Sequence, residues 1–443
     1  MAYSKAVFAA LKKAGASEGD IVRVKSGAMD YSGTLVPNTA GSPDCIVVKL
    51  PSGYHASFKC RDCSVERLAA KAQQPAQAAK ALKKRLDLPE VSMIATGGTI
   101  SARVDYTLGG VKPALSPQEI FEAAPELEGL VNFRKMHSPF RIFSENMSPR
   151  EWGAIAKEVA KELNAGADGA IVMHGTDTLA YTGAALSFML GGLQKPVALV
   201  GAMKSPDRGS FDGTLNLLGA ANYAGRSDIA EVAVVMHASA DDSYCNAIRA
   251  TKARKMHSSR RDAFRPVNDI PLARVWPDGR IEKLQECRPR GGGKVVARTG
   301  FEQQTAILKA YPGSPPELLD YLASKKYRGI VIEGTGLGHA PMRPLERKLS
   351  WEEPIKRAVD AGVVVAVATQ CLYGTANAFV YETARLMKSL GAVYCADMLP
   401  EVAYVKLGWL LGQEKDPQKV AVGMTQNIAG ELNPRLSEKS FLV

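Results

Sequence analysis

A short polar segment that directly follows an apolar run is the strongest candidate for chemistry in this sequence. The run GAIVM, residues 169–173, is followed by His174-Gly-Thr-Asp-Thr178, which places a carboxylate between two hydroxyls. In open α/β sheets, ligands bind outside the carboxyl ends of the strands, so polar residues after an apolar run belong there. Capping one helix needs only one of Thr176, Asp177 and Thr178. The additional side chains indicate a site.

Thr176 needs a base if its hydroxyl is to attack a carbonyl, because a hydroxyl is a poor nucleophile at neutral pH. His174 lies two residues earlier, and it could simply complete the strand. A lysine can also serve when burial or cationic neighbours lower its pKa, and Lys255 lies among basic residues. Those neighbours are Arg249, Lys252, Arg254 and Arg260. Asp177 could orient Lys255, which would give a nucleophile, a base and an orienting acid.

A second candidate loop is TGGT, which follows the apolar run VSMIA and ends at Thr99. Gly97 and Gly98 would let the backbone approach a ligand with its amides free to donate, and Thr99 would present a hydroxyl. The alternative is a tight turn in which Thr99 caps the next helix. A third junction of this kind is GAMK at residues 201–204, after the run PVALV.

Several common catalytic motifs are missing from the sequence. No P-loop, no G-x-S-x-G elbow and no H-E-x-x-H is present, so the motifs support neither phosphate chemistry nor a zinc protease. Seven irregularly spaced cysteines do not form a disulfide framework, and they favour a reduced cytoplasmic location. Cys60 and Cys63 have no second ligand pair, so we expect them to pack in a small β domain, and we expect Cys371 to be structural.

The charge balance is compatible with an anionic partner but does not demand one. Lys and Arg total 56 against 45 Asp and Glu, for a net charge of +11. The densest basic cluster, residues 249–265, could be a solvated face or a nucleic-acid contact, and we favour a local role around Lys255. The longest apolar runs, such as GVVVAVA at 362–368, are far shorter than the ~20 residues that cross a bilayer. The N-terminus lacks the apolar region of a signal peptide.

The pattern of apolar residues predicts the strands and helices that must position these side chains. From residue 91, short apolar runs alternate with amphipathic segments, which predicts an α/β fold with mostly parallel sheets covered by helices. The first block has the runs VSMIAT, FRIFS, GAIVM, PVALVG and EVAVVM, and a second block has RGIVIEG and VVVAVAT. A loop-rich interval at 279–300 separates the two blocks. Ser-x-x-Glu segments at Ser116, Ser148 and Ser350 predict capped helix starts.

Four domain segments follow from this pattern. Residues 1–70 contain short β-type runs separated by Gly, Pro, Asn and Ser, which predicts a small β-barrel domain. Residues 71–90 are polar and alanine-rich, as in a linker. The rest of the chain divides into two α/β domains, 91–285 and 286–443.

Four segments in the same order resemble those of the bacterial-type L-asparaginase superfamily. TGGTI at 96–100 and HGTDT at 174–178 look like its two signature segments, and KPVALVGAM at 195–203 follows the second. The segment IRATKARKMHSSRRDAF, which ends at residue 264, resembles the one that carries the catalytic lysine. The resemblance implies that both α/β domains are asparaginase-like, with the catalytic residues in the first.

The domain at 1–70 is not part of ordinary asparaginases. With RKMHSSRRDAF and QCLYGTAN at 370–377, it makes the chain similar to the archaeal-type glutamyl-tRNA(Gln) amidotransferase D-subunit family. In that family the asparaginase-like chain releases ammonia from L-glutamine or L-asparagine. Its partner, the E subunit, uses that ammonia, with ATP and Mg²⁺, to convert Glu-tRNA(Gln) to Gln-tRNA(Gln).

The resemblance also implies what the chain binds and with what it assembles. It implies an amidohydrolase that binds no cofactor or metal of its own and has no membrane contact. The D subunits would form a homodimer within a heterotetramer, and the partner would make most of the contacts with tRNA. The alternatives are a free-standing cytoplasmic asparaginase or glutaminase, which the domain at 1–70 opposes, and a non-catalytic tRNA-binding scaffold.

The site residues carry over motif by motif. The implied catalytic residues are Thr99, Thr176, Asp177 and Lys255, and their presence opposes the scaffold alternative. Thr99 is the first choice of nucleophile, although the roles of the two threonines could be exchanged. The implied substrate contacts are Gly98, Tyr106, Ser144, Glu145 and Ala202.

Each implied substrate contact has its own function in the family. Tyr106, which resembles the family's mobile-loop tyrosine, would assist the nucleophile, and Ser144 and Glu145 would hold the α-carboxylate and α-ammonium groups. The backbone amide of Ala202, with that of Thr176, would face the developing oxyanion.

Two positions depart from the pattern of periplasmic asparaginases. The stretch GTGLGH at 334–339 replaces a GxGNGN-like segment, so contacts by Leu337 or His339 do not carry over. Glu145 stands where many of these hydrolases have Gln or Asp, and it could adjust the fit for a longer amide such as glutamine.

Overall fold

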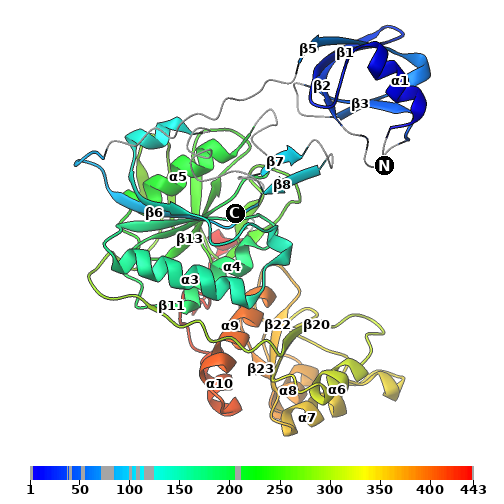
Figure 1. The fold of residues 1–443 in the computed structure, drawn as a ribbon. Helices are drawn as coiled ribbons and strands as arrows, with labels where there is room; N and C mark the ends of the chain where they lie inside the picture. Colours follow the sequence, from blue (N-terminus) through cyan, green and yellow to red (C-terminus); the bar gives the residue numbers. More distant parts are fainter. Residues whose placement is uncertain are drawn as a thin grey trace.

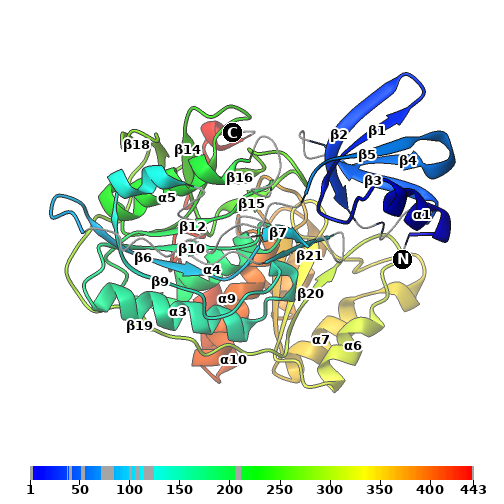
Figure 2. The same cartoon turned by 45° about the horizontal axis from the view of Figure 1, so that its top comes forward.

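The described residues form three large sheets and three two-stranded ones, and the large sheets belong to an N-terminal β domain and two α/β units. The computed structural model describes residues 3–36, 38, 42–50, 55–70, 84–98, 102–105, 110–113, 124–204 and 211–441. Figures 1 and 2 show the N-terminal domain as a lobe of its own, beside two α/β units that pack against each other.

The N-terminal domain is a five-stranded antiparallel sheet with one helix. Its elements are α1 (Lys5–Lys13), β1 (Ile21–Ser26), β2 (Met29–Val36), β3 (Cys45–Lys49), β4 (His55–Lys59), the 3₁₀ turn η1 (Cys60–Asp62) and β5 (Ser64–Ala69). The period-two alternation in β1 buries Val22 and Val24, and the continuously buried β3 adds Ile46 to the same core as Val7 and Leu11 of α1. In the described residues the strand order is β4-β3-β2-β1-β5, so an antiparallel β domain is confirmed.

The first α/β unit is built on an eight-stranded sheet in the order β18-β17-β14-β13-β12-β10-β6-β9. Its parallel part is β6 (Glu90–Ala95), β9 (Asn132–His137), β10 (Gly169–Met173), β12 (Val197–Val200) and β13 (Val232–His237). The antiparallel part is β14 (Cys245–Arg249), β17 (Ala273–Val275) and β18 (Ile281–Lys283).

Helices cover both faces of this sheet, which buries its central strands. The helices α3 (Pro149–Asn164) and α4 (Leu179–Met189) share one core, and α5 (Gly213–Arg226) packs in the core of the other face. Smaller elements are the hairpins β7 (Ala102–Asp105) with β8 (Gly110–Pro113) and β15 (Ala253–Lys255) with β16 (Phe264–Pro266), the pair β11 (Leu190–Gly191) with β19 (Val296–Ala297), and the 3₁₀ turns η3 (Pro125–Gly129) and η4 (Ser144–Asn146).

The second α/β unit has a four-stranded sheet in which all neighbours are parallel. Its strands are β20 (Thr305–Lys309), β21 (Gly329–Gly334), β22 (Val364–Thr369) and β23 (Val393–Tyr394). Its helical elements are α6 (Glu317–Ser324), η5 (Arg347–Leu349), α7 (Glu352–Asp360), α8 (Glu382–Ser389), α9 (Pro400–Gln413), α10 (Pro417–Met424) and η6 (Glu438–Ser440). The predicted α/β class with mostly parallel sheets is confirmed.

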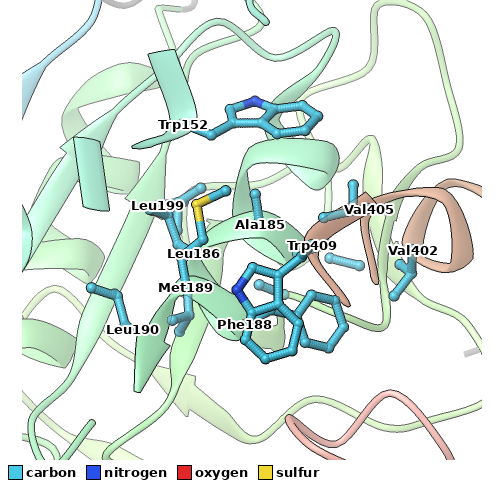
Figure 3. Close-up of a cluster of buried hydrophobic side chains, with 14 of the residues drawn as sticks. Trp152, Ala185, Leu186, Phe188, Met189, Leu190, Leu199, Val402, Val405 and Trp409 are labelled. Carbon is cyan, nitrogen blue, oxygen red and sulfur yellow. The ribbon is translucent and has the colours of Figure 1, made fainter. Parts of the chain in front are cut away.

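A single hydrophobic core joins the two α/β units through α4 and α9. Phe188 of α4 stacks on Trp409 of α9, with ring centroids 5.8 Å apart and planes inclined by 24°. Figure 3 shows this pair, with Leu186 and Val405 nearby in the same cluster. The units therefore have little freedom to separate without exposing apolar surface.

Two local predictions failed and one is confirmed. The segment FRIFS, residues 140–144, is not a strand, because β9 ends earlier and the Ile142 amide donates to the Thr96 carbonyl, which fixes the segment across the end of β6. The capping box at Ser148 is present, but Ser350 has none: Trp351 is the N-cap of α7, and the Ser350 hydroxyl donates to the Met342 carbonyl and accepts from the Glu352 amide. The segment at Ser116 lies outside the described residues.

The described residues include no helix that is long and apolar enough to span a bilayer.

Candidate active site

The two loops singled out in the sequence meet at adjacent strand ends. The amide and the hydroxyl of Thr96, after β6, both donate to the carbonyl of Met173, the last residue of β10. Gly98 has a φ of +85°, and a Cβ there would lie 2.4 Å from the Cα of Gly175. Only glycine fits at this contact, so the TGGT loop lies directly against the HGTDT loop.

Lys255 joins the two catalytic candidates of the HGTDT loop. It is the last residue of β15, and its Nζ donates to Oγ1 of Thr176 at 2.9 Å and to Oδ1 of Asp177 at 2.6 Å. Thr176 is buried, whereas the Asp177 side chain is 65% exposed. The predicted Thr, Lys and Asp set is therefore brought together, with its carboxylate towards solvent.

This arrangement can transfer a proton. If Lys255 gives up one proton, its nitrogen can accept the Thr176 hydroxyl proton while another N–H still donates to Asp177. The exposed carboxylate of Asp177 then orients the amine and stabilises the ammonium group that forms.

His174 has a structural role. Its Nδ1 lies 2.7 Å from the Gly175 carbonyl, which can only accept, so Nδ1 carries the proton and Nε2 accepts from the Thr182 hydroxyl at 2.8 Å. Burial lowers the pKa of His174 to about 4. His174 directly follows β10, and its amide donates to the Val200 carbonyl at 2.9 Å, next to the last pair of the β10–β12 ladder.

Ser144 and Glu145 lie in η4, next to the HGTDT loop. The hydroxyl of Thr178 donates to the Ser144 carbonyl at 2.6 Å, and a Cβ on Gly175 would lie 2.8 Å from Oγ of Ser144. Ser144 is buried and Glu145 is exposed. Thr178 thus fixes η4 beside Thr176, a function that the sequence did not suggest for it.

Ala202 lies in the loop after β12, on the other side of Thr176. A Cβ on Gly201 would lie 2.8 Å from the methyl group of Thr176, so the two backbones pack closely. Two residues hold this loop: Asp212, which directly precedes α5, and Asn216, which lies within α5. Asp212 accepts from the amides of Met203 and Lys204 at 2.9 and 2.8 Å, and Asn216 donates to the Gly201 carbonyl at 3.0 Å.

Asp212 and Asn216 were not predicted from the sequence. The one available signal was the pair of polar residues one helical turn apart in SFDGTLN, residues 210–216, separated by five residues from the end of GAMK. Their bonds fix the backbone around Ala202, where the family pattern places an oxyanion donor.

Two predicted site residues, Thr99 and Tyr106, lie outside the described residues. In the GTGLGH turn, the amide of Asn377 donates to the Leu337 carbonyl, and the His339 ring packs edge-on against Tyr381 at 5.1 Å. Those contacts belong to the second α/β unit.

The Lys and Arg side chains of the basic stretch 249–265 form ion pairs with carboxylates. The pairs are Arg249 with Glu231 and Asp269, Lys252 with Asp397, Arg254 with Glu401, Lys255 with Asp177, Arg260 and Arg265 with Asp262, and Arg261 with Asp242. Because every cation of the cluster has a carboxylate, the stretch has little free positive charge to offer a polyanion.

The cysteines and the acidic residues form no metal site in the described part of the chain. Cys60 and Cys63 pack against the core of the N-terminal domain, as expected. Burial raises the pKa of Cys63 to about 11.

Three family models match the chain. "GatD N-terminal domain" matches residues 16–68, "Asparaginase, N-terminal" matches residues 90–287, and "Glutaminase/Asparaginase C-terminal domain" matches residues 304–424. The first model corresponds to the N-terminal β domain and the other two to the α/β units.

Curated relatives match over almost the whole chain. The D subunit of glutamyl-tRNA(Gln) amidotransferase from Pyrococcus furiosus is 46% identical, covering 98% of this chain and 99% of its own. The corresponding protein of Methanothermobacter thermautotrophicus is 43% identical, with 97% of each chain covered.

Among solved structures, the thermostable L-asparaginase from Thermococcus kodakarensis superposes with a TM-score of 0.69 at 28% identity, covering 78% of this chain and all of its own. L-asparaginase I from Vibrio cholerae superposes with a TM-score of 0.67 at 28% identity, covering 78% of this chain and 99% of its own.

Proposed function

Because the chain belongs to the D-subunit family of glutamyl-tRNA(Gln) amidotransferases, with an asparaginase-type amidase fold, we propose that it hydrolyses the side-chain amide of L-glutamine or L-asparagine. The ammonia would serve the conversion of Glu-tRNA(Gln) to Gln-tRNA(Gln). The observation that carries the proposal is the contact of Lys255 with both Thr176 and Asp177.

The proposed reaction has two steps. A threonine hydroxyl attacks the carboxamide carbon while its proton passes to the Lys255 set, the C–N bond breaks, and ammonia leaves with that proton. Water then hydrolyses the acyl ester, which restores the threonine and releases the acid. Thr99 is our first choice of nucleophile, assisted by Tyr106, and Thr176, Lys255 and Asp177 handle the proton.

Backbone donors would stabilise the developing oxyanion. The amides of Thr176 and Ala202 are the proposed donors, and the packing of Thr176 against Gly201 supports their proximity. One such donor contributes about 3 kcal/mol to the transition state. Ser144 and Glu145 would bind the substrate's α-carboxylate and α-ammonium groups, with Gly98 giving backbone access.

We propose the assembly that the resemblance implies. A homodimer of this chain would bind two copies of the partner, the E subunit, which would use ATP and Mg²⁺ and make most tRNA contacts. The ion-paired state of the stretch 249–265 supports this division, because that stretch has little charge left for tRNA. We also propose the domain division 1–70, 71–90, 91–285 and 286–443, with the N-terminal sheet curled into a small barrel.

Glutamine and asparagine hydrolysis by the purified chain tests the proposal. Turnover is measured alone and with the partner, Glu-tRNA(Gln) and ATP, and we expect strong stimulation in the complex. High turnover without stimulation would instead support a free-standing hydrolase. No turnover under any condition would support a non-catalytic scaffold.

A further inference from the structure

The strand that carries Lys255 is attached to the second α/β unit by a buried ion pair. Lys252 has no exposed surface, and its Nζ donates to Oδ2 of Asp397 at 2.6 Å. Asp397 lies just before α9 and also accepts from the backbone amide and the side-chain amide of Asn433, at 3.0 and 2.9 Å. The carboxylate therefore joins a segment of the first unit to two segments of the second.

A second ion pair links the same face of the strand to the second α/β unit. Arg254 Nε lies 3.5 Å from Glu401 Oε1 in α9. Because successive side chains of a strand point to opposite faces, Lys252 and Arg254 face the second unit, whereas Ala253 and Lys255 face the first. Anchors on one face thus fix the direction in which Lys255 projects from the other.

The return strand of the hairpin is held at the same place. The amide of Val267, after β16, donates to the Lys252 carbonyl at 2.9 Å, which closes the base of the hairpin. Next to it, Asn268 has a φ of 57° and donates to the carbonyls of Gly374 and Asp397 at 3.0 and 3.1 Å. Both ends of the hairpin are therefore bonded to the second unit.

Stability alone does not explain a buried ion pair here. Replacing such a pair by apolar residues of similar volume is often neutral or stabilising, because two charges must be taken out of water. Burial lowers the pKa of Lys252, and Asp397 opposes that shift. An ion pair fixes geometry better than an apolar contact does. Because this pair lies three residues from Lys255, it fits a requirement to hold the Lys255 amine in position.

We propose that Lys252 and Asp397 are positioning residues of the amidase reaction, through which the second α/β unit sets the distance from Lys255 to Thr176 and Asp177. The inference rests on the proposed function, because it assigns a catalytic purpose to that distance. Movement of α9 relative to the first unit would shift the hairpin, and with it the proton-handling amine. A displacement of ~1 Å in such a site lowers turnover by about a hundredfold.

A matched pair of variants tests this inference in the full chain. Lys252→Met removes an ammonium group that has no exposed surface and leaves Asp397 with its bonds from Asn433. Lys406→Met does the same at the other buried pair, where Glu431 keeps its bonds from the amides of residues 428 and 429. Lys406 lies in α9 and has no bond to the hairpin among the described contacts, so it controls for the loss of a buried charge.

We expect Lys252→Met to lower kcat for amide hydrolysis at least ~10-fold while KM changes less than ~3-fold, with Lys406→Met keeping kcat within ~3-fold. Amide hydrogen exchange in residues 253–256 should be faster than in the wild type for Lys252→Met and unchanged for Lys406→Met. Equal kcat losses in the two variants, or unchanged kcat and exchange in Lys252→Met, would overturn the inference.

A double variant and the exchange measurement cover two other outcomes of this experiment. If Lys252→Met does not fold, Lys252→Met/Asp397→Leu replaces the pair by apolar side chains, and the same loss of kcat and faster exchange are expected. If the wild-type chain hydrolyses no amide, the proposed function fails. The exchange measurement then still decides whether the ion pair holds the hairpin.

Discussion

At the scale of single residues, Thr176 combines two contacts that can be separated by mutation. Its hydroxyl accepts from Lys255, and its methyl group packs against the backbone of Gly201. The first contact belongs to the proposed proton transfer and the second to the fit between two loops. Valine keeps the shape and loses the hydroxyl, whereas serine keeps the hydroxyl and loses the methyl group.

We predict that Thr176→Val lowers kcat/KM for amide hydrolysis by about a thousandfold or more, because the proton relay is removed. Thr176→Ser should retain activity within about tenfold, since the hydroxyl can still reach Lys255. Steady-state ammonia release measures both variants, and thermal unfolding should show both folded. Activity of Thr176→Val near the wild-type value would contradict the assignment.

His174 gives the folded state a pH dependence that is unrelated to catalysis. Burial lowers its pKa from 6.5 to about 4, whereas in the unfolded chain the imidazole titrates near 6.5. Between those values the unfolded chain binds more protons than the folded chain. The free energy of unfolding therefore falls as the pH is lowered from 6.5 towards 4, and it does not change through this group above 6.5.

We predict that the wild type loses about 2 kcal/mol more stability than His174→Gln when the pH falls from 7 to 5. The variant should be less stable at pH 7, because glutamine does not reproduce both imidazole hydrogen bonds. Urea unfolding at the two pH values gives the four free energies. If the wild type and the variant lose the same amount, His174 is not the titrating group.

At the scale of elements, the sequence predicted the parts of the fold that local pattern decides. The strand ends at TGGT and HGTDT were predicted and do meet, since adjacent parallel strands bring their carboxyl ends to one edge of the sheet. The capping box at Ser148 needs only four residues and was also predicted. The predicted strand at 140–144 is wrong because a short apolar run has the same sequence pattern whether it pairs as a strand or forms a partly buried loop.

The contact between the two loops depends on one glycine, for which a control exists. We predict that Gly98→Ala lowers hydrolysis by about a hundredfold or more, because its Cβ would meet Gly175 at 2.4 Å and displace Thr176. Gly166 also has a positive φ, but its nearest neighbour is an arginine nitrogen 3.9 Å away. Gly166→Ala should therefore lose ~1–2 kcal/mol of stability with kcat unchanged. Equal activity of the two variants would contradict the prediction.

At the scale of the whole molecule, the residues that the sequence could not identify are those that act from a distance. Asp397 lies 145 residues from Lys252, and no spacing rule connects the two. In the same way, the cluster 249–265 looked like an excess of positive charge, because its carboxylate partners come from all over the fold. Side-chain types predicted the chemistry of the site, but only the fold shows what holds it in place.

The N-terminal domain offers a test at this largest scale. The domain has a hydrophobic core of its own. The whole L-asparaginase of Thermococcus kodakarensis superposes on 78% of this chain. The site lies between residues 96 and 255, all within the asparaginase-like part. We predict that a chain without residues 1–83 hydrolyses free amide substrate within ~3-fold of the full chain. Ammonia release measures this, with Thr176→Val as the inactive baseline. A truncated chain that folds but is as inactive as that baseline would show that the β domain takes part in the chemistry.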